Sequence, residues 1–465
     1  MKLTGRSHLN NIRTIRITFA AVVILTALIA GAIWQNRPFA WSQERQITNG
    51  SGDSRLVDLS TDPSGNILHL AWEDNRDDTM EVYYKRSLDD GVTWGPDVRL
   101  SYLTPHTVEP EPRLATDGKT VLVFFSNRTS TGEHLFYVAS SDAGSNFSLP
   151  IQLTHDLGGQ TNAALVFVGS TVHLVWQGYF NDGEEYIFYA KSPNAGLTWQ
   201  PETALTSTTT AQDRHAAIAA VGDKVFVAWS RFYQGREAIY VRASFDSGVT
   251  WKPEVQVSDY EVPSFLEFSA IGSNGTHVHM VWNSQGIQYS RSSDSGATWT
   301  TSTPLTNTTR QYIAPRISVV GSQIRVVTAA ISAEGDPRHV RVASDVYYMS
   351  SSDGGQSWMK PASLTVHKPE VLSLAPVIWS YGDATFIAWQ DNRDGRYAVF
   401  FLSRPDFAIL RGFEWQLLIP IVIVLVAATA LYVGLELRPR PAKRRIVRKR
   451  RAHRRSNRRR GRARG

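Results

Sequence analysis

One eight-residue pattern recurs along this chain, and it limits the possible folds more than any other feature. The pattern is close to Ser-x-Asp-x-Gly-x-x-Trp. Its copies are "SLDDGVTW" from Ser87, "SSDAGSNF" from Ser140, "SPNAGLTW" from Ser192, "SFDSGVTW" from Ser244, "SSDSGATW" from Ser292 and "SSDGGQSW" from Ser351. Their first residues are 53, 52, 52, 48 and 59 residues apart. A near-constant period of this length indicates a fold built from repeated units.

The residues around each octet predict a unit of four strands. A short run of aromatic and β-branched residues, such as Val82–Ser87, precedes each octet. A second run, ending in Trp or a substitute, lies about a dozen residues earlier, and a third lies before it. A short fourth run after the octet ends in Leu-Thr, Leu-Ser or a close variant. We name these strands A to D in chain order, which places the octet at the C–D turn.

The octet residues suit a structural role. Asp or Asn can accept hydrogen bonds from backbone amides further along the turn, and Gly tolerates a left-handed backbone. The closing Trp or Phe is a large apolar group that begins strand D. The residues to which we assign this role are Asp89, Asp142, Asn194, Asp246, Asp294, Asp353, Trp94, Trp199, Trp251, Trp299 and Trp358.

This octet resembles the Asp-box, or bacterial neuraminidase repeat (BNR), of sialidases and other β-propellers. The resemblance covers roughly residues 41–405 and implies an all-β propeller of four-stranded antiparallel blades. In that family the box lies at the blade rim, away from the active site. The box itself therefore implies no activity.

The number of blades follows from a seventh unit after the last octet. This unit has strands A, B and C but no octet and no strand D. The N-terminal segment "FAWSQERQITN" (39–49) has the Trp and the pattern of a strand D. We therefore predict seven blades, closed by residues 41–48 pairing near 397–403, because closure removes exposed sheet edges. The alternative is a six-bladed ring, the number found in sialidases.

The resemblance also implies candidate ligand-binding residues, because sialidases hold a carboxylate with three arginines. Four arginines stand at predicted starts of A strands, which line the central channel in propellers. They are Arg55, Arg113, Arg214 and Arg316. A guanidinium group matches a carboxylate with two parallel hydrogen bonds. The alternative is that some of these arginines pair with nearby acids such as Glu109 and Glu111.

Candidate catalytic residues also follow from the resemblance, which implies a Tyr nucleophile, an activating Glu and an Asp acid/base. Tyr312 and Glu267 could fill the first two roles, and Asp74 or Asp77 the third. The sialidase Arg-Ile-Pro signature is absent, since Leu-Val follows Arg55. The acids lie in the B–C loop "WEDNRDD", which resembles "WQDNRDGR" of the last blade. An alternative interpretation of both loops is a hairpin turn with solvated charges.

Three histidines stand at one position of strand B, three residues before its Trp. They are His69, His173 and His279, and Phe226 and Phe386 occupy the same position in other units. We interpret them as packing residues between blades. We predict no metal site and no cofactor.

The two ends of the chain differ from its centre. Residues 17–34 and 415–435 contain no charge, and runs of this length can span a bilayer, so we predict a transmembrane helix on each side of the propeller. The first could instead be a cleaved signal peptide. Residues 1–16 and 436–465 are basic. Residues 1–16 and 438–465 hold 20 of the 49 Lys and Arg and no acid, which leaves 29 Lys and Arg against 42 acids, about −13, in residues 17–437. There is no cysteine, and therefore no disulfide.

These features lead to a location and to two functional hypotheses. Basic flanks stay in the cytoplasm, so the propeller would lie outside the cell membrane. The first hypothesis is a non-catalytic binder of glycan, protein or envelope polymer. The alternative is a sialidase-like exo-glycosidase that hydrolyses terminal acidic sugars. The Arg-rich tail, expected to be disordered, could bind anionic lipid or nucleic acid, or serve only as a topology signal.

Overall fold

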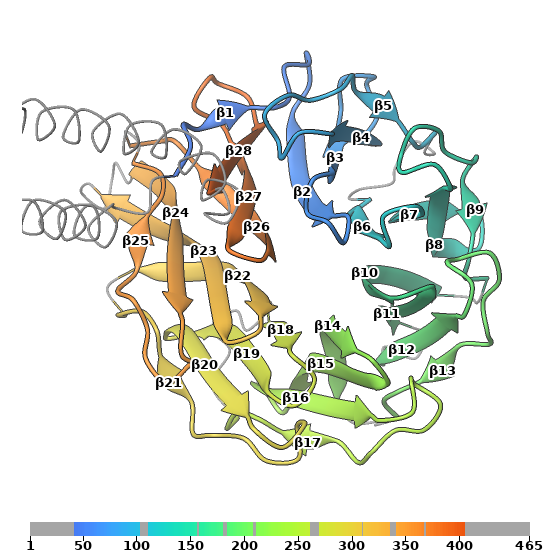
Figure 1. Cartoon of the computed structure of the whole chain (residues 1–465), viewed down its shortest axis with the longest axis vertical. Helices are drawn as coiled ribbons and strands as arrows, with labels where there is room; N and C mark the ends of the chain where they lie inside the picture. The colour runs from blue at the N-terminus through green and yellow to red at the C-terminus, as the bar shows by residue number, and fades with distance from the viewer. Residues whose placement is uncertain are drawn as a thin grey trace, which may run out of the picture. The chain divides into compact units, whose positions relative to one another are not determined.

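The strands of the chain form seven four-stranded units arranged in a ring (Figure 1). This is a computed structural model. It describes residues 41–102, 110–155, 158–179, 184–207, 211–260, 269–308, 310–334, 341–366 and 369–404. The chain divides into two units, Met1–Phe407 and Ala408–Gly465, and the second lies outside the described residues.

The first three blades have their strands in the order A to D. Blade 1 contains β2 (Ser54–Thr61), β3 (Leu68–Asp74), β4 (Glu81–Ser87) and β5 (Val98–Arg99). Blade 2 contains β6 (Arg113–Thr116), β7 (Val121–Thr129), β8 (Gly132–Ser140) and β9 (Ile151–Gln152). Blade 3 contains β10 (Gly158–Val168), β11 (Thr171–Tyr179), β12 (Glu185–Ser192) and β13 (Thr203–Ala204). A short parallel pairing of β10 with β8 joins blades 2 and 3.

The next three blades repeat this order. Blade 4 contains β14 (Gln212–Val221), β15 (Lys224–Tyr233), β16 (Arg236–Ser244) and β17 (Val255–Gln256). Blade 5 contains β18 (Ser269–Ser273), β19 (Val278–Ser284), β20 (Gly286–Ser292) and β21 (Thr303–Pro304). Blade 6 contains β22 (Gln311–Val320), β23 (Gln323–Glu334), β24 (Arg341–Ser351) and β25 (Ala362–Ser363).

Blade 7 closes the ring with a strand from the other end of the sequence. It contains β26 (Ser373–Tyr381), β27 (Ala384–Asp391), β28 (Ala398–Arg404) and β1 (Arg45–Gln46). Arg45 lies opposite Phe401, and Gln46 lies opposite Phe400. The predicted pairing of the N-terminal segment with the last strand C is therefore confirmed.

Each octet is a turn held by its own side chains, as the sequence predicted. In the first octet, Asp89 Oδ1 accepts two hydrogen bonds, one from Ser87 Oγ (2.8 Å) and one from the backbone amide of Thr93 (2.7 Å). Hydrogen bonds from Thr93, through its hydroxyl and its amide, lower the pKa of Asp89. The glycine of each octet has a positive φ, as at Gly91 (79°), and this backbone is least strained for glycine.

The aromatic residue at the end of each octet joins two blades. Trp251 of blade 4 meets the edge of Tyr189 of blade 3, with ring centroids 5.0 Å apart. Trp41 takes this role in blade 7, 5.0 Å from Tyr348 of blade 6. The same kind of contact recurs around the ring, and each hydrophobic cluster combines residues of two neighbouring blades. The ring is therefore stabilised by packing between blades rather than by a core inside each one.

The three histidines of strand B are buried within these interfaces, which confirms their predicted packing role. The Nδ1 atom of His69 lies 2.6 Å from the Tyr84 hydroxyl, and His173 and His279 make the same contact with Tyr189 and Tyr289. Burial is the main cause that lowers the pKa of each histidine to about 4.

The fold prediction needs one correction, which concerns the flanking transmembrane helices. The part of the chain that the structure describes contains strands and no helix, so it contains none that could cross a membrane. The two apolar runs, 17–34 and 415–435, and the basic segments 1–16 and 436–465, lie outside the described residues. The transmembrane interpretation rested on the length, apolarity and flanking residues of these runs, and no element of the structure supports it.

Candidate functional site

The candidate site lies on the innermost strands of the ring. The first strand of each blade faces the centre of the ring (Figure 1), and successive first strands contact one another. Five of these seven strands contain a β-bulge, for example between Arg55 and Asp58. A non-glycine residue with positive φ marks this position in six blades. These residues are Leu56, Glu111, Asn162, His215, Ala314 and Ala375.

The bulge defines a set of seven equivalent residues, which we call the inner tier. In six blades the member lies two positions after the residue with positive φ. In blade 5, where that residue is not described, the member is the one that pairs with strand B in the same register. The members, from blade 1 to blade 7, are Asp58, Arg113, Ala164, Ala217, Ala270, Arg316 and Val377. Blades 3, 4 and 5 thus contribute alanine, while the charged members come from blades 1, 2 and 6.

The three charged members of the inner tier act on one another. Burial lowers the pKa of Arg316 to about 10, and repulsion from Arg113 lowers it further, while Asp58 and Glu111 oppose the shift. Burial also raises the pKa of Asp58, although Arg113, the amide of Leu114 and Arg316 offset part of this effect. Arg113 and Arg316 belong to blades 2 and 6, so this electrostatic interaction links the innermost strands of two blades that are not neighbours in the ring.

Neither of these two arginines forms an ion pair within the described part of the chain. Arg113 Nη1 donates to the carbonyl of Pro112 (3.0 Å), and Arg316 Nη1 donates to the carbonyl of Pro315 (3.2 Å). The carboxylate of Asp58 accepts the amide of Leu114 at 2.8 Å and so joins blade 1 to blade 2. Arg113 and Arg316 thus lie on innermost strands as half-buried residues, and each guanidinium group retains hydrogen-bonding capacity.

The other two predicted arginines lie on the opposite side of the bulge and have partners. Arg55 Nη2 pairs with Asp53 (2.7 Å), and its guanidinium carbon lies 4.7 Å from the ring centroid of Tyr397. Arg214 of blade 4 pairs with Glu185 of blade 3, with Nη2 3.1 Å from Oε1. The structure thus brings together two of the four predicted arginines and places the other two in separate ion pairs.

The predicted acid Asp74 is part of a buried ion pair. Its carboxylate accepts hydrogen bonds from Ser54 Oγ (2.7 Å), Trp72 Nε1 (3.2 Å) and three nitrogens of Arg76. Burial alone would raise the pKa of Asp74, but the bonds from Arg76 and Ser54 hold it below its ordinary value. Arg76 in turn pairs with Asp97, which immediately precedes strand D (2.6 Å).

This arrangement recurs in blade 7 and, with a change, in blade 4. In blade 7, Asp391 is bound by Arg393, which pairs with Glu44 at 2.7 Å. In blade 4, Arg231 binds Glu254 together with Asp213, which comes from strand A. The two similar B–C loops of the sequence are therefore structural clamps between strands B and D. The alternative prediction of solvated charges does not hold for these buried pairs.

The remaining catalytic candidates are dispersed. Asp77 accepts the Tyr83 hydroxyl and pairs with Arg99 at 3.1 Å. Tyr312 is 5% exposed in an apolar cluster between blades 5 and 6, where burial and the neighbouring Tyr347 raise its pKa. Glu267 lies outside the described residues, so its role, like those of the other candidates, stays a prediction. No group of three or more His, Asp or Glu that could hold a metal ion occurs within the described ranges.

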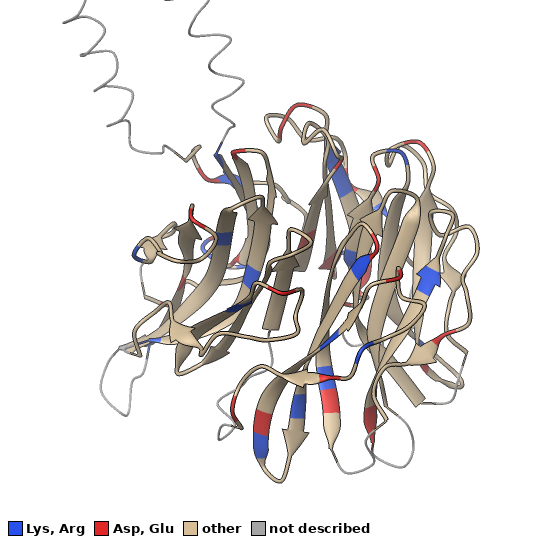
Figure 2. Cartoon of the chain, turned by 60° about the horizontal axis from the view of Figure 1, so that its bottom comes forward, with Lys and Arg blue, Asp and Glu red and all other residues tan. Residues whose placement is uncertain are grey.

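Charge alone does not mark the site on the ring. Figure 2 shows basic and acidic residues interspersed over the blades rather than gathered on one side. The alignment of Asp58 with Arg113 and Arg316 was missed in the sequence because the residue with positive φ two positions earlier is not a glycine in any of the six blades where it is described. The proline immediately before Arg113 and before Arg316 was the available signal, and both residues share it.

Comparison with known proteins identifies the family. The model of the BNR repeat-like domain matches residues 22–280, which is more than half of the chain. The chain belongs to the BNR repeat-like family. The predicted resemblance to Asp-box propellers is thereby confirmed. No curated protein matches the BNR repeat-like chain.

Solved structures share the fold of the BNR repeat-like chain at low sequence identity. An ulvan lyase of polysaccharide lyase family PL25 aligns with a TM-score of 0.52 and 11% identity, over 77% of this chain and 95% of that one. Trypanosoma rangeli sialidase in complex with sialic acid aligns at 0.44 and 11%, over 68% and 56%. A Dyadobacter fermentans protein of unknown function aligns at 0.42 and 13%, over 78% and 98%. At 11% identity the likeness to the ulvan lyase concerns the fold alone.

Proposed function

We propose that this chain is a non-catalytic binding propeller whose inner tier holds the anionic group of an acidic saccharide. The observation that carries the proposal is the pair of guanidinium groups of Arg113 and Arg316, which repel each other and form no direct ion pair among the described residues, although Asp58 and Glu111 act on Arg316 electrostatically. A bound carboxylate or sulfate would relieve this repulsion and could accept hydrogen bonds from both.

The rest of the inner tier suits a ligand larger than a simple ion. Ala164, Ala217 and Ala270 hold the same register in blades 3, 4 and 5, and an alanine side chain is smaller than those of the charged members. Asp58 reduces the net positive charge of the tier, which favours a ligand with one negative group over a dense polyanion. A sugar acid carries one carboxylate on a neutral ring and meets both conditions.

The hydrolase alternative has less support. A tyrosine nucleophile must be activated by a neighbouring base, but Tyr312 lies among apolar side chains, where its raised pKa opposes ionisation. Asp74 is held as a carboxylate by Arg76, so it is poorly suited to donate a proton. The binding interpretation needs neither residue. The location outside the cell and the ligands of the basic tail stay predictions.

The test is a binding measurement with the full chain. Sialyllactose and an oligosaccharide of glucuronic acid are titrated by calorimetry, with lactose as the neutral control. We expect the acidic probes to bind and lactose not to bind. Arg113→Met and Arg316→Met should each weaken binding at least about tenfold, since charged hydrogen bonds contribute about 1.5–3 kcal/mol. Arg55→Met, on the other side of the bulge, should bind as the wild type does.

Two results would overturn the proposal. Equal binding of lactose, or unchanged affinity in both inner-tier variants, would show that the anionic group is not held by these arginines. Turnover of a fluorogenic sialoside that is lost in Tyr312→Phe would show that the chain is an enzyme.

A further inference from the structure

One tryptophan of the ring differs from all the others in its exposure. Trp379 lies on β26, the innermost strand of blade 7, and is 36% exposed, whereas every other described tryptophan is buried or half-buried. Its indole N–H donates to no residue in the part of the chain that the structure describes. An exposed aromatic ring with an unused donor suits contact with a ligand better than packing within the fold.

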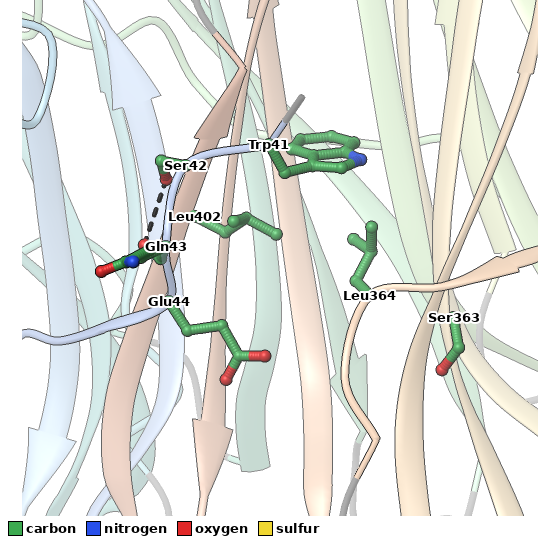
Figure 3. Close-up of a pocket in the computed structure, with 7 residues that line it drawn as sticks. All are labelled: Trp41, Ser42, Gln43, Glu44, Ser363, Leu364 and Leu402. Atoms are coloured by element: carbon green, nitrogen blue, oxygen red, sulfur yellow. Dashed lines mark hydrogen bonds between the residues drawn. The ribbon is translucent and has the colours of Figure 1, made fainter. Parts of the chain in front are cut away.

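The other described tryptophans occupy two repeated structural positions. Those of strand B are fully buried, and they are Trp72, Trp176, Trp229, Trp282 and Trp389. Those that begin strand D close the seams between blades. Figure 3 shows one of these, Trp41, whose ring lies near the side chains of Leu402 and Leu364 at the seam of blades 6 and 7. Trp379 belongs to neither set, so no repeated feature of the fold accounts for it.

The equivalent residues of the other six blades are small. Trp379 pairs with Phe386, which stands at the histidine position of strand B. The same pairing identifies one residue in each blade, and we call these seven residues the second tier. From blade 1 to blade 7 they are Ser60, Ala115, Val166, Ala219, Gly272, Ser318 and Trp379. The fold therefore needs no large side chain at this position, and the tryptophan is particular to blade 7.

The second tier lies one step along the strands from the inner tier. Trp379 follows Val377, the inner-tier member of blade 7, by two residues. Residues two apart in a strand lie on the same side of it, about 7 Å from each other. The strand β26 contacts β22 and β2, which carry the charged inner-tier members Arg316 and Asp58. Blade 7 thus stands between two charged members and adds an exposed indole beside them.

Resting on the function proposed above, we propose that Trp379 is the platform for the pyranose ring of the acidic saccharide. A step of about 7 Å along the strand is close to the length of a sugar acid, so a carboxylate bound at the inner tier brings the sugar ring to the indole. The C–H groups on one face of a pyranose pack against an aromatic ring, and the indole N–H can donate to a hydroxyl of the ligand. The site therefore selects a cyclic acid over an open-chain acid of the same charge.

The test is a calorimetric titration of the full chain with methyl β-glucuronide and with gluconate. Both probes carry one carboxylate and several hydroxyl groups, but only the first has a ring. The wild type should bind methyl β-glucuronide at least about fivefold more tightly than gluconate. Trp379→Leu, which keeps an apolar side chain, should bind the glucuronide only as well as gluconate. Trp379→Phe keeps an aromatic face and should retain most of the preference.

Two controls separate this inference from the proposed function. Tyr233→Leu removes a ring with the same 36% exposure from β15, outside the innermost strands, and should bind both probes as the wild type does. Arg316→Met should weaken both probes alike. If the wild type binds both equally through Arg316, or if Trp379→Leu keeps the preference for the ring, Trp379 is not the platform, although the proposed function stands. If neither acid binds, the proposed function fails and the role of Trp379 fails with it.

Discussion

The three buried histidine–tyrosine pairs make the ring sensitive to acid over a defined pH range. Burial lowers the pKa of these histidines to about 4 in the folded protein, compared with 6.5 ordinarily. Between these values the unfolded chain binds more protons than the folded chain. Stability is therefore complete above about pH 6.5, falls as the pH is lowered toward about 4, and falls no further below that through these groups.

The size of this effect follows from the two pKa values. At about pH 4.5, each histidine reduces the free energy of unfolding by about 2.5 kcal/mol. The three act at separate interfaces and should add, giving about 7–8 kcal/mol. This is a large part of the 5–15 kcal/mol that is typical of a folded domain.

Blade 7 supplies the substitution that tests this reasoning. Phe386 and Phe401 occupy the histidine and tyrosine positions there and stack with ring centroids 6.3 Å apart, close to the 6.0 Å of His69 and Tyr84. We therefore choose a variant in which the histidine and the tyrosine of all three pairs are replaced by phenylalanine. No buried tyrosine hydroxyl is then left without its histidine partner. It should remain folded at neutral pH.

The measurement is urea unfolding of the full chain at about pH 7.5 and about pH 4.5, followed by tryptophan fluorescence. His215 also has its pKa lowered to about 4, by burial and by Arg214, and it remains in the variant. The wild type should lose about 10 kcal/mol between the two pH values, and the variant about a quarter of that. The octet aspartates, with lowered pKa values, act below this range. A variant that loses as much stability as the wild type would refute the reasoning.

Three further predictions concern the packing of the ring. Gly355→Ala should cost about 2–4 kcal/mol, because its Cβ would lie 1.8 Å from a tyrosine hydroxyl. Gly354→Ala, which has the same kind of positive φ but open space around it, should cost only about 1 kcal/mol. Trp41→Ala should cost about 3 kcal/mol in the same assay, and no loss would contradict its role at the interface of blades 6 and 7. Arg76→Leu should lower the free energy of unfolding by about 3–5 kcal/mol, because the buried carboxylate of Asp74 loses its cation. The control Arg236→Leu, at an exposed position, should lower it by less than about 0.5 kcal/mol. Equal melting temperatures of the two variants would exclude the structural clamp.

Much of the architecture was readable from local patterns. The octets marked the C–D turns because their Asp, Gly and Trp have roles that depend on residues close in sequence. The closing strand was predictable because segment 41–48 repeats the Trp and the apolar spacing of a strand D. The Phe residues at the histidine position in other blades likewise indicated packing.

The candidate site was less predictable, because it depends on register and on distant partners. In the sequence all four arginines stand near the start of a strand A. In the structure Arg55 and Arg214 precede the residue with positive φ, whereas Arg113 and Arg316 follow it. The loop acids were placed on the correct turn, but the second partner of Arg76, Asp97, lies just before strand D and could not be identified from the loop alone. Tyr312 is near Arg316 in sequence but lies among the apolar residues of the neighbouring interface.

The closure of blade 7 also sets an order of events during synthesis. Arg45 is synthesised before any of the blades is complete, whereas its partner Phe401 is synthesised last in the ring. The strand β1 therefore stays unpaired while the other six blades form. Until then β28 of one molecule could accept β1 of another, and the product would be a pair of rings with exchanged first strands. Slow elongation or high concentration of nascent chains should therefore increase the yield of exchanged dimers, while a finished ring, with its last edge covered, should not exchange.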